Sequence, residues 1–123
     1  MRIFKTTWFT RFADKEDITD KTLKGVVSQL EAGQFDADLG GGVYKQRVAR
    51  LGGGKSGGYR IVICFKQGER SFFLYGFPKS DKANITTSEK ADLKKLAKTF
   101  FAMKDAELDL LVKSGSLQEI SEV

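Results

Sequence analysis

The sequence predicts an α+β fold in which helices pack on one face of a small, mainly antiparallel sheet. Three observations lead to this prediction. Two stretches with apolar residues at helical spacing come first, a central block of β-branched and aromatic segments follows, and two further helical stretches end the chain. Only short turns connect these stretches. The 123 residues are therefore expected to form a single domain, residues 1–123, with one hydrophobic core.

The first elements are a short strand and an aromatic helix. Met1 to Phe4 is expected to be a strand. After it, aromatic residues recur at spacings that place them on one side of a helix, and these are Phe4, Trp8, Phe9 and Phe12. We expect Trp8 to contribute to packing.

A second helix follows the polar segment that starts at Asp14. Its apolar residues repeat at helical spacing and are Leu23, Val26, Val27 and Leu30. Asp17, Thr19 or Asp20 is a suitable N-terminal cap, and Gly33 is a natural end. Gly25 lies inside this helix, where glycine costs about 1 kcal/mol relative to alanine. We therefore expect a close packing contact at Gly25.

The central block predicts an antiparallel meander. Its strands are Val43 to Leu51, Tyr59 to Lys66 and Arg70 to Phe77. Turns are expected at Gly57–Gly58 and Gln67–Gly68. The run Ile61 to Phe65 is apolar without alternation, which predicts a central strand covered on both faces. Alternation along the first strand places Lys45 and Arg47 on the same face.

The C-terminal part predicts two helices and a final strand. Thr86 and Glu89 have the spacing of a capping box. The apolar stripe of the helix that they begin comprises Leu93, Leu96, Ala97, Phe100 and Phe101. Asp105 to Lys113 is expected to be a shorter helix that ends near Gly115, and Ser116 to Ser121 a small strand.

Charge is distributed unevenly along the chain. Residues 40–82 carry nine Lys and Arg against two acids, whereas residues 104–123 carry two lysines against five acids. Residues 104–123 therefore read as a C-terminal acidic extension. The cations of residues 40–60 accompany eight of the thirteen glycines, a combination that gives a polyanion such as RNA close access. Lysines and arginines on an edge strand also prevent aggregation between sheets, which is the alternative interpretation.

Some kinds of chemistry are excluded or disfavoured by composition. The chain has no histidine and one cysteine, Cys64, which excludes an intramolecular disulfide and the Ser-His and Cys-His dyads, and disfavours most metal sites. Cys64 lies in the central apolar strand and is expected to be a small buried hydrophobe. The glycine-rich segment 52–58 contains Lys55 but precedes a strand, whereas a phosphate-binding P-loop leads into a helix. A mobile hairpin that carries Lys55 toward an RNA backbone is the better interpretation.

Three segments of the central block carry a further signal when they are taken together. They are YKQRVAR at residues 44–50, GKSGGYRIV at residues 54–62 and FFLYGFPKSDKANI at residues 72–85. Together they resemble the RelE/HigB family of bacterial toxins from type II toxin–antitoxin modules. The resemblance extends from about Gly40 to Phe101. It implies a RelE-like fold and a ribosome-dependent mRNA endoribonuclease that a cognate antitoxin neutralises.

The resemblance also implies roles for individual residues. The expected catalytic residues are Lys45, Arg47, Arg60 and Lys79. Among the expected RNA-binding residues, the resemblance implies Lys82, whereas Arg50 and Lys55 are expected from the charge of their own segment. Tyr59 is expected to stack on a base, and so could Tyr75, but strand aromatics are more often core or cross-strand partners. Arg60 corresponds to an arginine that contacts the scissile phosphate. Some relatives have a tyrosine shortly after the turn that contains Lys79, where this chain has Asn84 and Ile85.

The residue types suit cleavage of RNA by its own 2′-hydroxyl group. Guanidinium groups remain charged and bind phosphate oxygens, so Arg47 and Arg60 suit charge stabilisation. Lys45 is the candidate for proton transfer, because a lysine among other cations can lose its proton and an arginine cannot.

The alternatives are a non-catalytic toxin-fold protein that inhibits DNA gyrase, and a plain RNA-binding module. We expect ribosome and mRNA as partners, no metal, no small-molecule cofactor, no membrane association and a cytoplasmic location. The start of the chain has no apolar run of signal-peptide length.

Overall fold

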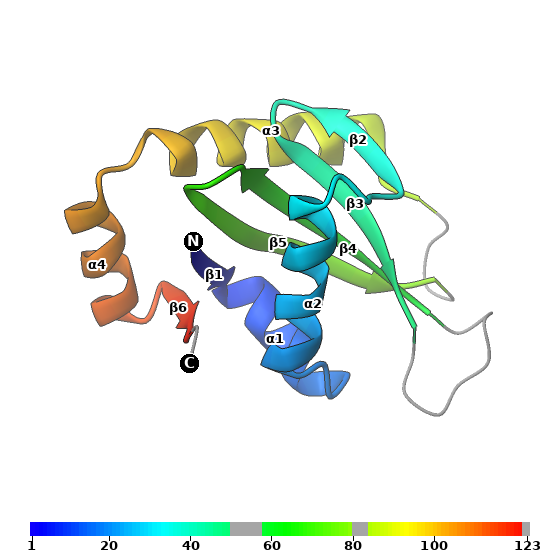
Figure 1. Ribbon diagram of the computed structural model, residues 1–123, viewed down its shortest axis with the longest axis horizontal. Coiled ribbons are helices and arrows are strands. Elements are labelled where there is room, and N and C mark those ends of the chain that lie inside the picture. Colours follow the sequence, from blue (N-terminus) through cyan, green and yellow to red (C-terminus); the bar gives the residue numbers. More distant parts are fainter. Residues whose placement is uncertain (50–57, 80–83, 122–123) are drawn as a thin grey trace.

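The computed structural model describes residues 1–49, 58–79 and 84–121, and confirms the α+β class (Figure 1). Its elements, in chain order, are β1 (Arg2–Thr6), α1 (Thr7–Lys15), α2 (Asp20–Glu31), β2 (Ala37–Gly40), β3 (Val43–Val48), β4 (Tyr59–Lys66), β5 (Arg70–Pro78), α3 (Thr87–Ala102), α4 (Asp105–Ser114) and β6 (Leu117–Ile120).

The strands form one sheet with the order β2-β3-β4-β5-β1-β6. Every neighbouring pair is antiparallel except β1 and β5, which are parallel, so the expectation of a mainly antiparallel sheet is confirmed. β6 pairs with β1 along four residue pairs. The segment predicted to be an acidic extension therefore supplies an edge strand of the sheet.

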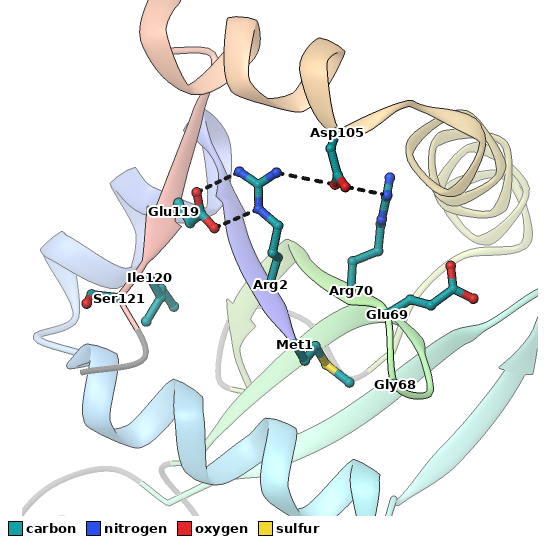
Figure 2. Close-up of a pocket in the computed structure, with 9 residues that line it drawn as sticks. All are labelled: Met1, Arg2, Gly68, Glu69, Arg70, Asp105, Glu119, Ile120 and Ser121. Atoms are coloured by element: carbon teal, nitrogen blue, oxygen red, sulfur yellow. Dashed lines mark hydrogen bonds and ion pairs between the residues drawn. The ribbon is translucent and has the colours of Figure 1, made fainter.

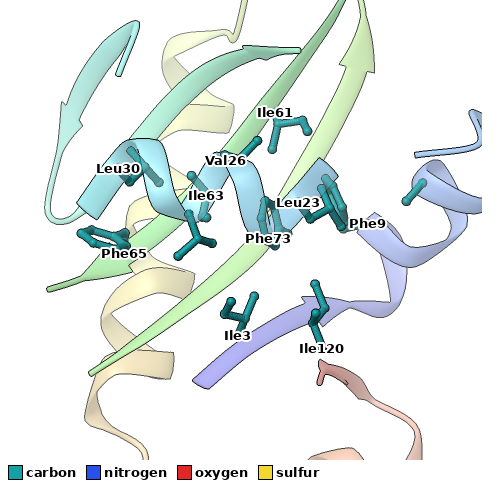
Figure 3. Packing of buried hydrophobic residues seen from close by; sticks show 12 residues of the cluster. Ile3, Phe9, Leu23, Val26, Leu30, Ile61, Ile63, Phe65, Phe73 and Ile120 are labelled. Atoms are coloured by element: carbon teal, nitrogen blue, oxygen red, sulfur yellow. The ribbon is translucent and has the colours of Figure 1, made fainter. Parts of the chain in front are cut away.

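Helices cover both faces of the sheet, so the prediction that they pack on one face is wrong. α1 and α2 lie on one face, where Phe9 and Leu23 join a cluster with Ile61 and Ile63 of β4 (Figure 3). α3 and α4 lie on the other face, where the cluster includes Val62 and Cys64 of β4. Successive β4 residues therefore point to opposite apolar layers, and the prediction of a central strand buried on both faces is confirmed.

Local signals predicted the ends of several elements. Thr19 caps α2 by accepting a hydrogen bond from the backbone N–H of Thr22. Thr86 and Glu89 form the predicted capping box of α3. Gly115 ends α4 in the left-handed conformation, with a φ of 85°.

One prediction in this part of the chain fails, and one strand was not predicted. Outside the backbone of α2 itself, Gly25 has no atom within 4 Å of the position that a Cβ would occupy, so the expected close contact is absent. The strand β2 was not predicted, because its four residues include Asp38 and Gly40 and lack a β-branched residue. The predicted strand from Val43 to Leu51 corresponds to β3, which ends at Val48. Leu51 and Gly57 lie outside the described residues.

An irregularity in β5 determines which side chains face the α3 layer. Val62 pairs with Tyr75, but the next residue, Ile63, pairs with Phe73, so Leu74 is an extra residue in β5. A bulge of this kind changes the alternation of the strand. Phe73 packs in the α1 and α2 layer, whereas Tyr75 packs against the α3 layer.

Candidate nucleic-acid interface

Arg47 of β3 and Arg60 of β4 lie directly opposite each other in the antiparallel register. Residues in such positions have Cβ atoms about 5 Å apart, and two like charges there destabilise the pairing. With Lys79 they line an open pocket of about 290 Å³, whose other lining residues are Val48, Ala49 and Gly58. Three cations in one depression form a binding site for an anion such as a phosphate group.

Backbone geometry at Gly58 brings these cations together. A Cβ at Gly58 would lie 2.9 Å from the carbonyl oxygen of Val48 and 3.9 Å from Nη1 of Arg60. A larger residue would therefore push β3 away from the start of β4. The backbone N–H of Lys79 donates to the carbonyl of Gly58 at 3.1 Å, which holds the end of β5 beside Arg60.

Asp36 contacts Arg47 at the edge of this cationic pocket. Its carboxylate accepts a hydrogen bond from the backbone N–H of Arg47 and lies 3.5 Å from Nε of the same residue. The Arg47 side chain nevertheless remains 67% exposed. Asp36 therefore orients Arg47 and leaves its guanidinium accessible to a ligand.

Lys45 lies on the same face of β3, two residues before Arg47, and is opposite Val62. Its Nζ donates a hydrogen bond to Oδ1 of Asn84 at 3.1 Å. Lys45 does not line the pocket. Two residues along a strand span about 7 Å, which is about the spacing of one nucleotide, so Lys45 is adjacent to the pocket.

Tyr59 does not belong to this surface. It precedes Arg60 in β4 and points to the opposite face, where it is only 4% exposed. Its hydroxyl donates to Oε2 of Glu16 at 3.1 Å, and its ring meets Phe12 edge to face. The burial of Tyr59 favours the core alternative over contact with RNA, in agreement with alternation along β4.

Other expected RNA-binding residues cannot be placed on this surface. Arg50, Lys55 and Lys82 lie outside the described residues. Asn84 accepts a hydrogen bond from Lys45, although sequence reasoning did not identify it as a site residue. Tyr75, for which stacking on a base and a core role were the two interpretations, packs against the α3 layer. The β5 bulge that turns Tyr75 to this face leaves no clear pattern in the sequence.

A larger pocket lies elsewhere and contains a network of ion pairs (Figure 2). It has a volume of about 740 Å³. Arg2 donates two hydrogen bonds to Glu119, at 2.9 and 2.8 Å, and one to Asp109 at 2.7 Å. Arg70 donates to Asp105 and to the carbonyl of Met103. Because both arginines bind acceptors of the chain itself, this pocket holds β1, α4 and β6 together.

These contacts also affect titration. The hydrogen bonds that Arg2 donates to Glu119 and Asp109 raise the pKa of its guanidinium group, although burial opposes this effect. Cys64 is buried, which confirms the prediction. This burial raises the pKa of its thiol.

Two searches of the described residues gave negative results. Among residues 1–49, 58–79 and 84–121, no three Cys, Asp or Glu side chains are grouped as a metal site. In the same ranges, every helix is too short or too polar to cross a membrane.

Comparison with known proteins identifies the family. A comparison with curated proteins found no match. The family model described as the RelE toxin of the RelE/RelB toxin–antitoxin system matches residues 1–120, which is nearly the whole chain. The chain therefore belongs to the RelE toxin family and is a toxin of a toxin–antitoxin system.

Proposed function

We propose that this toxin is an endoribonuclease that cleaves mRNA on the ribosome and thereby inhibits translation. The observation that carries the proposal is the direct opposition of Arg47 and Arg60, with Lys79 lining the same open pocket. A pair of like charges is unfavourable in a sheet unless anions compensate it. In the described part of the chain, the carboxylate of Asp36 lies beside Arg47 alone, so Arg60 and Lys79 leave the pocket with positive charge that a further anion can compensate. Membership of the RelE family supports RNA as that anion.

The reaction is attack of a ribose 2′-oxygen on the adjacent phosphorus. The new P–O2′ bond forms while the P–O5′ bond breaks, so the products are a 2′,3′-cyclic phosphate and a 5′-hydroxyl. Negative charge increases on the phosphate oxygens in the transition state. Arg60 and Arg47 stabilise that charge, because guanidinium groups stay protonated and can bind two oxygens at once.

Two protons move in this reaction, one from the 2′-hydroxyl and one to the leaving 5′-oxygen. Lys45 is the proposed base for the first proton, since its neutral amine can accept it. Asn84 holds the amine by accepting a hydrogen bond at 3.1 Å. Lys79, whose ammonium group lies in the pocket of Arg47 and Arg60, is the proposed proton donor to the leaving 5′-oxygen.

The shape of the site supports dependence on the ribosome. Among the described residues, the pocket is open and is lined by the adjoining ends of β3, β4 and β5. This described part of the surface does not by itself hold an RNA backbone in line for attack. We propose that the ribosome holds the message in this geometry, which supplies the orientation that the reaction needs.

The antitoxin that membership of the family implies would act against this same surface. An antitoxin that covers the Arg47 and Arg60 pair, or places acidic groups beside it, would keep the message away. The toxin would then be inactive in the complex and active once released.

Expression of the wild type, Arg60→Ala and Lys66→Ala, with mapping of 5′ ends on translated messages, tests the proposal. Lys66 is a matched control, because it lies in β4 at the other end from Arg60 and is exposed. We expect cleavage within codons for the wild type and Lys66→Ala, and its loss for Arg60→Ala. Growth inhibition with intact mRNA would contradict the proposal, and inhibition of DNA gyrase in the same cells would then favour the non-catalytic alternative.

A further inference from the structure

Trp8, near the start of α1, is the largest exposed aromatic side chain among the described residues and has 61% of its surface accessible. Its ring lies 4.6 Å from the ring of Tyr75, at an interplanar angle of 50°. Tyr75 in turn lies 5.6 Å from Phe77. These three rings form a continuous aromatic series that is exposed at Trp8.

A narrow pocket of about 140 Å³ opens beside Trp8 and Tyr75. Its opposite wall is α3, which contributes Leu93 and the 37% exposed Leu96. The lining is mainly apolar. Glu89 and Asp92 are the two carboxylates that complete it. A planar ligand with hydrogen-bond donors on one edge fits such a site, which we call the aromatic slot.

The aromatic slot lies on the same face of the sheet as the cationic surface, and the buried side chains of Val62 and Phe77 lie between them. Tyr75 pairs with Val62, and Val62 pairs with Lys45, so these three residues form one row across β5, β4 and β3. In the next row on the same face of the sheet, Phe77 pairs with Arg60. Adjacent strands lie about 5 Å apart, so the backbone of Tyr75 is about 10 Å from that of Lys45. One or two nucleotides span this distance.

We propose that the aromatic slot binds a base of the RNA strand whose phosphates contact Lys45, Arg47 and Arg60. Unstacked RNA bases stack on aromatic side chains and are recognised on their edges by hydrogen bonds. Trp8 and Tyr75 provide the stacking surface. This inference rests on the proposed function, and it names a base-recognition site that is separate from the phosphate contacts.

The carboxylates give the aromatic slot a base preference. Glu89 accepts the backbone N–H of Thr86 in the α3 capping box, so base recognition is assigned to Asp92. An ionised carboxylate only accepts hydrogen bonds. Guanine, adenine and cytosine carry an exocyclic amino group, whereas uracil has two carbonyl oxygens and one ring N–H. The aromatic slot should therefore prefer an amino-bearing base to uracil.

An apolar side chain of a protein partner, with a cation beside it, has similar chemistry. RNA is the better occupant because the aromatic slot shares its rows of residues with the cationic strand pair. The two occupants differ in one property that can be measured, which is whether single-stranded RNA reaches the Trp8 ring.

Intrinsic fluorescence tests the proposal, because Trp8 is the one tryptophan of the chain. Purified toxin is titrated to millimolar concentration with oligo(A), oligo(C) and oligo(U), in the wild type, Asp92→Asn and Glu31→Gln. Glu31 is an exposed acid at the end of α2 and serves as the control for loss of one negative charge. We expect saturable quenching, with oligo(U) about tenfold weaker than oligo(A) and oligo(C). Asp92→Asn should lose this difference, and Glu31→Gln should keep it.

Unchanged fluorescence, or equal quenching by the three oligonucleotides in the wild type, would overturn the proposal. Unchanged fluorescence would also assign the aromatic slot to another occupant, such as a protein segment. The outcome is independent of cleavage. Base-dependent quenching without cleavage on ribosomes would refute the proposed function alone, and cleavage without quenching would refute the aromatic slot alone.

Discussion

The ammonium group of Lys45 donates a hydrogen bond to the side-chain oxygen of Asn84, 3.1 Å away, and thereby connects β3 to the segment before α3. The same oxygen accepts the backbone N–H of Ile85 at 2.9 Å, so Asn84 is held in place locally. A neutral amide can position a lysine without adding a negative charge beside it. A carboxylate in the same place would stabilise the charged ammonium form.

Asn84→Asp should therefore shift the pH dependence of mRNA cleavage. If neutral Lys45 accepts the proton, the cleavage rate rises with pH, and a carboxylate at position 84 moves this rise upward by about one pH unit or more. Asn84→Ala should lower the rate without a comparable shift, because it removes the contact and adds no charge. The measurement is the single-turnover cleavage rate on programmed ribosomes as a function of pH. Identical midpoints for the Asp and Ala variants would exclude Lys45 as the base that Asn84 positions.

Two glycine substitutions should change stability in opposite directions. A Cβ at Gly76 would lie 2.4 Å from the ring of Phe12, so Gly76→Ala should lower the free energy of unfolding by about 1–3 kcal/mol. Gly25 is exposed within α2 and has open space around it, so Gly25→Ala should raise that free energy by up to about 1 kcal/mol. Urea denaturation of the three proteins checks both. If Gly76→Ala stabilised the protein, the close approach of Phe12 of α1 to β5 would be contradicted.

Arg2 should contribute more to stability than an ordinary surface cation. Its three hydrogen bonds to Glu119 and Asp109 join β1 to β6 and α4. Arg2→Ala should cost about 1–2 kcal/mol, and added salt should reduce the difference from the wild type. Lys66→Ala removes a half-exposed pair with Glu69 and should change stability by less than about 0.5 kcal/mol. Equal effects of the two substitutions in thermal or urea unfolding would contradict a structural role for the Arg2 network.

Cys64 should make stability decrease at alkaline pH. Burial raises the pKa of its thiol in the folded chain, so above about pH 8.5 the unfolded chain loses a proton that the folded chain retains. The unfolded state is then favoured as pH increases, and stability is greatest below this range. Cys64→Val keeps an apolar side chain of similar size and should lower this dependence. The check is urea unfolding of both proteins between neutral pH and about pH 10. If the free energy of unfolding fell equally with pH in both proteins, Cys64 would not be the cause of the alkaline loss of stability.

Local features of the fold were predictable from the sequence. The capping box of Thr86 and Glu89, the apolar run in β4 and the glycine at position 115 depend on residues close together in the chain. Long-range features were not predictable from the sequence. The parallel pairing of β1 with β5 and the helices on both faces depend on contacts between distant segments, which periodicity does not specify.

The candidate site was predictable to a similar degree. Alternation placed Lys45 and Arg47 on one face, but the opposition of Arg47 and Arg60 depends on the register of β3 with β4. Alternation with Arg60 could also have assigned Tyr59 to the core. Tyr75 faces the α3 layer because of the β5 bulge at Leu74. The sequence of β5 gives no sign of this bulge, which depends on pairing with β4.

In the proposed reaction, negative charge develops on phosphate oxygens that Arg60 and Arg47 are expected to bind, so the chemistry of the cleaved end tests the account most directly. Purified toxin is added to ribosomes programmed with a defined mRNA, and the 3′ end of the upstream fragment is identified by mass spectrometry. Attack by the 2′-hydroxyl predicts a 2′,3′-cyclic phosphate with the wild type and with Lys66→Ala, and no fragment with Arg60→Ala. Intact mRNA with the wild type, or an upstream fragment that ends in a 3′-hydroxyl, would contradict the account.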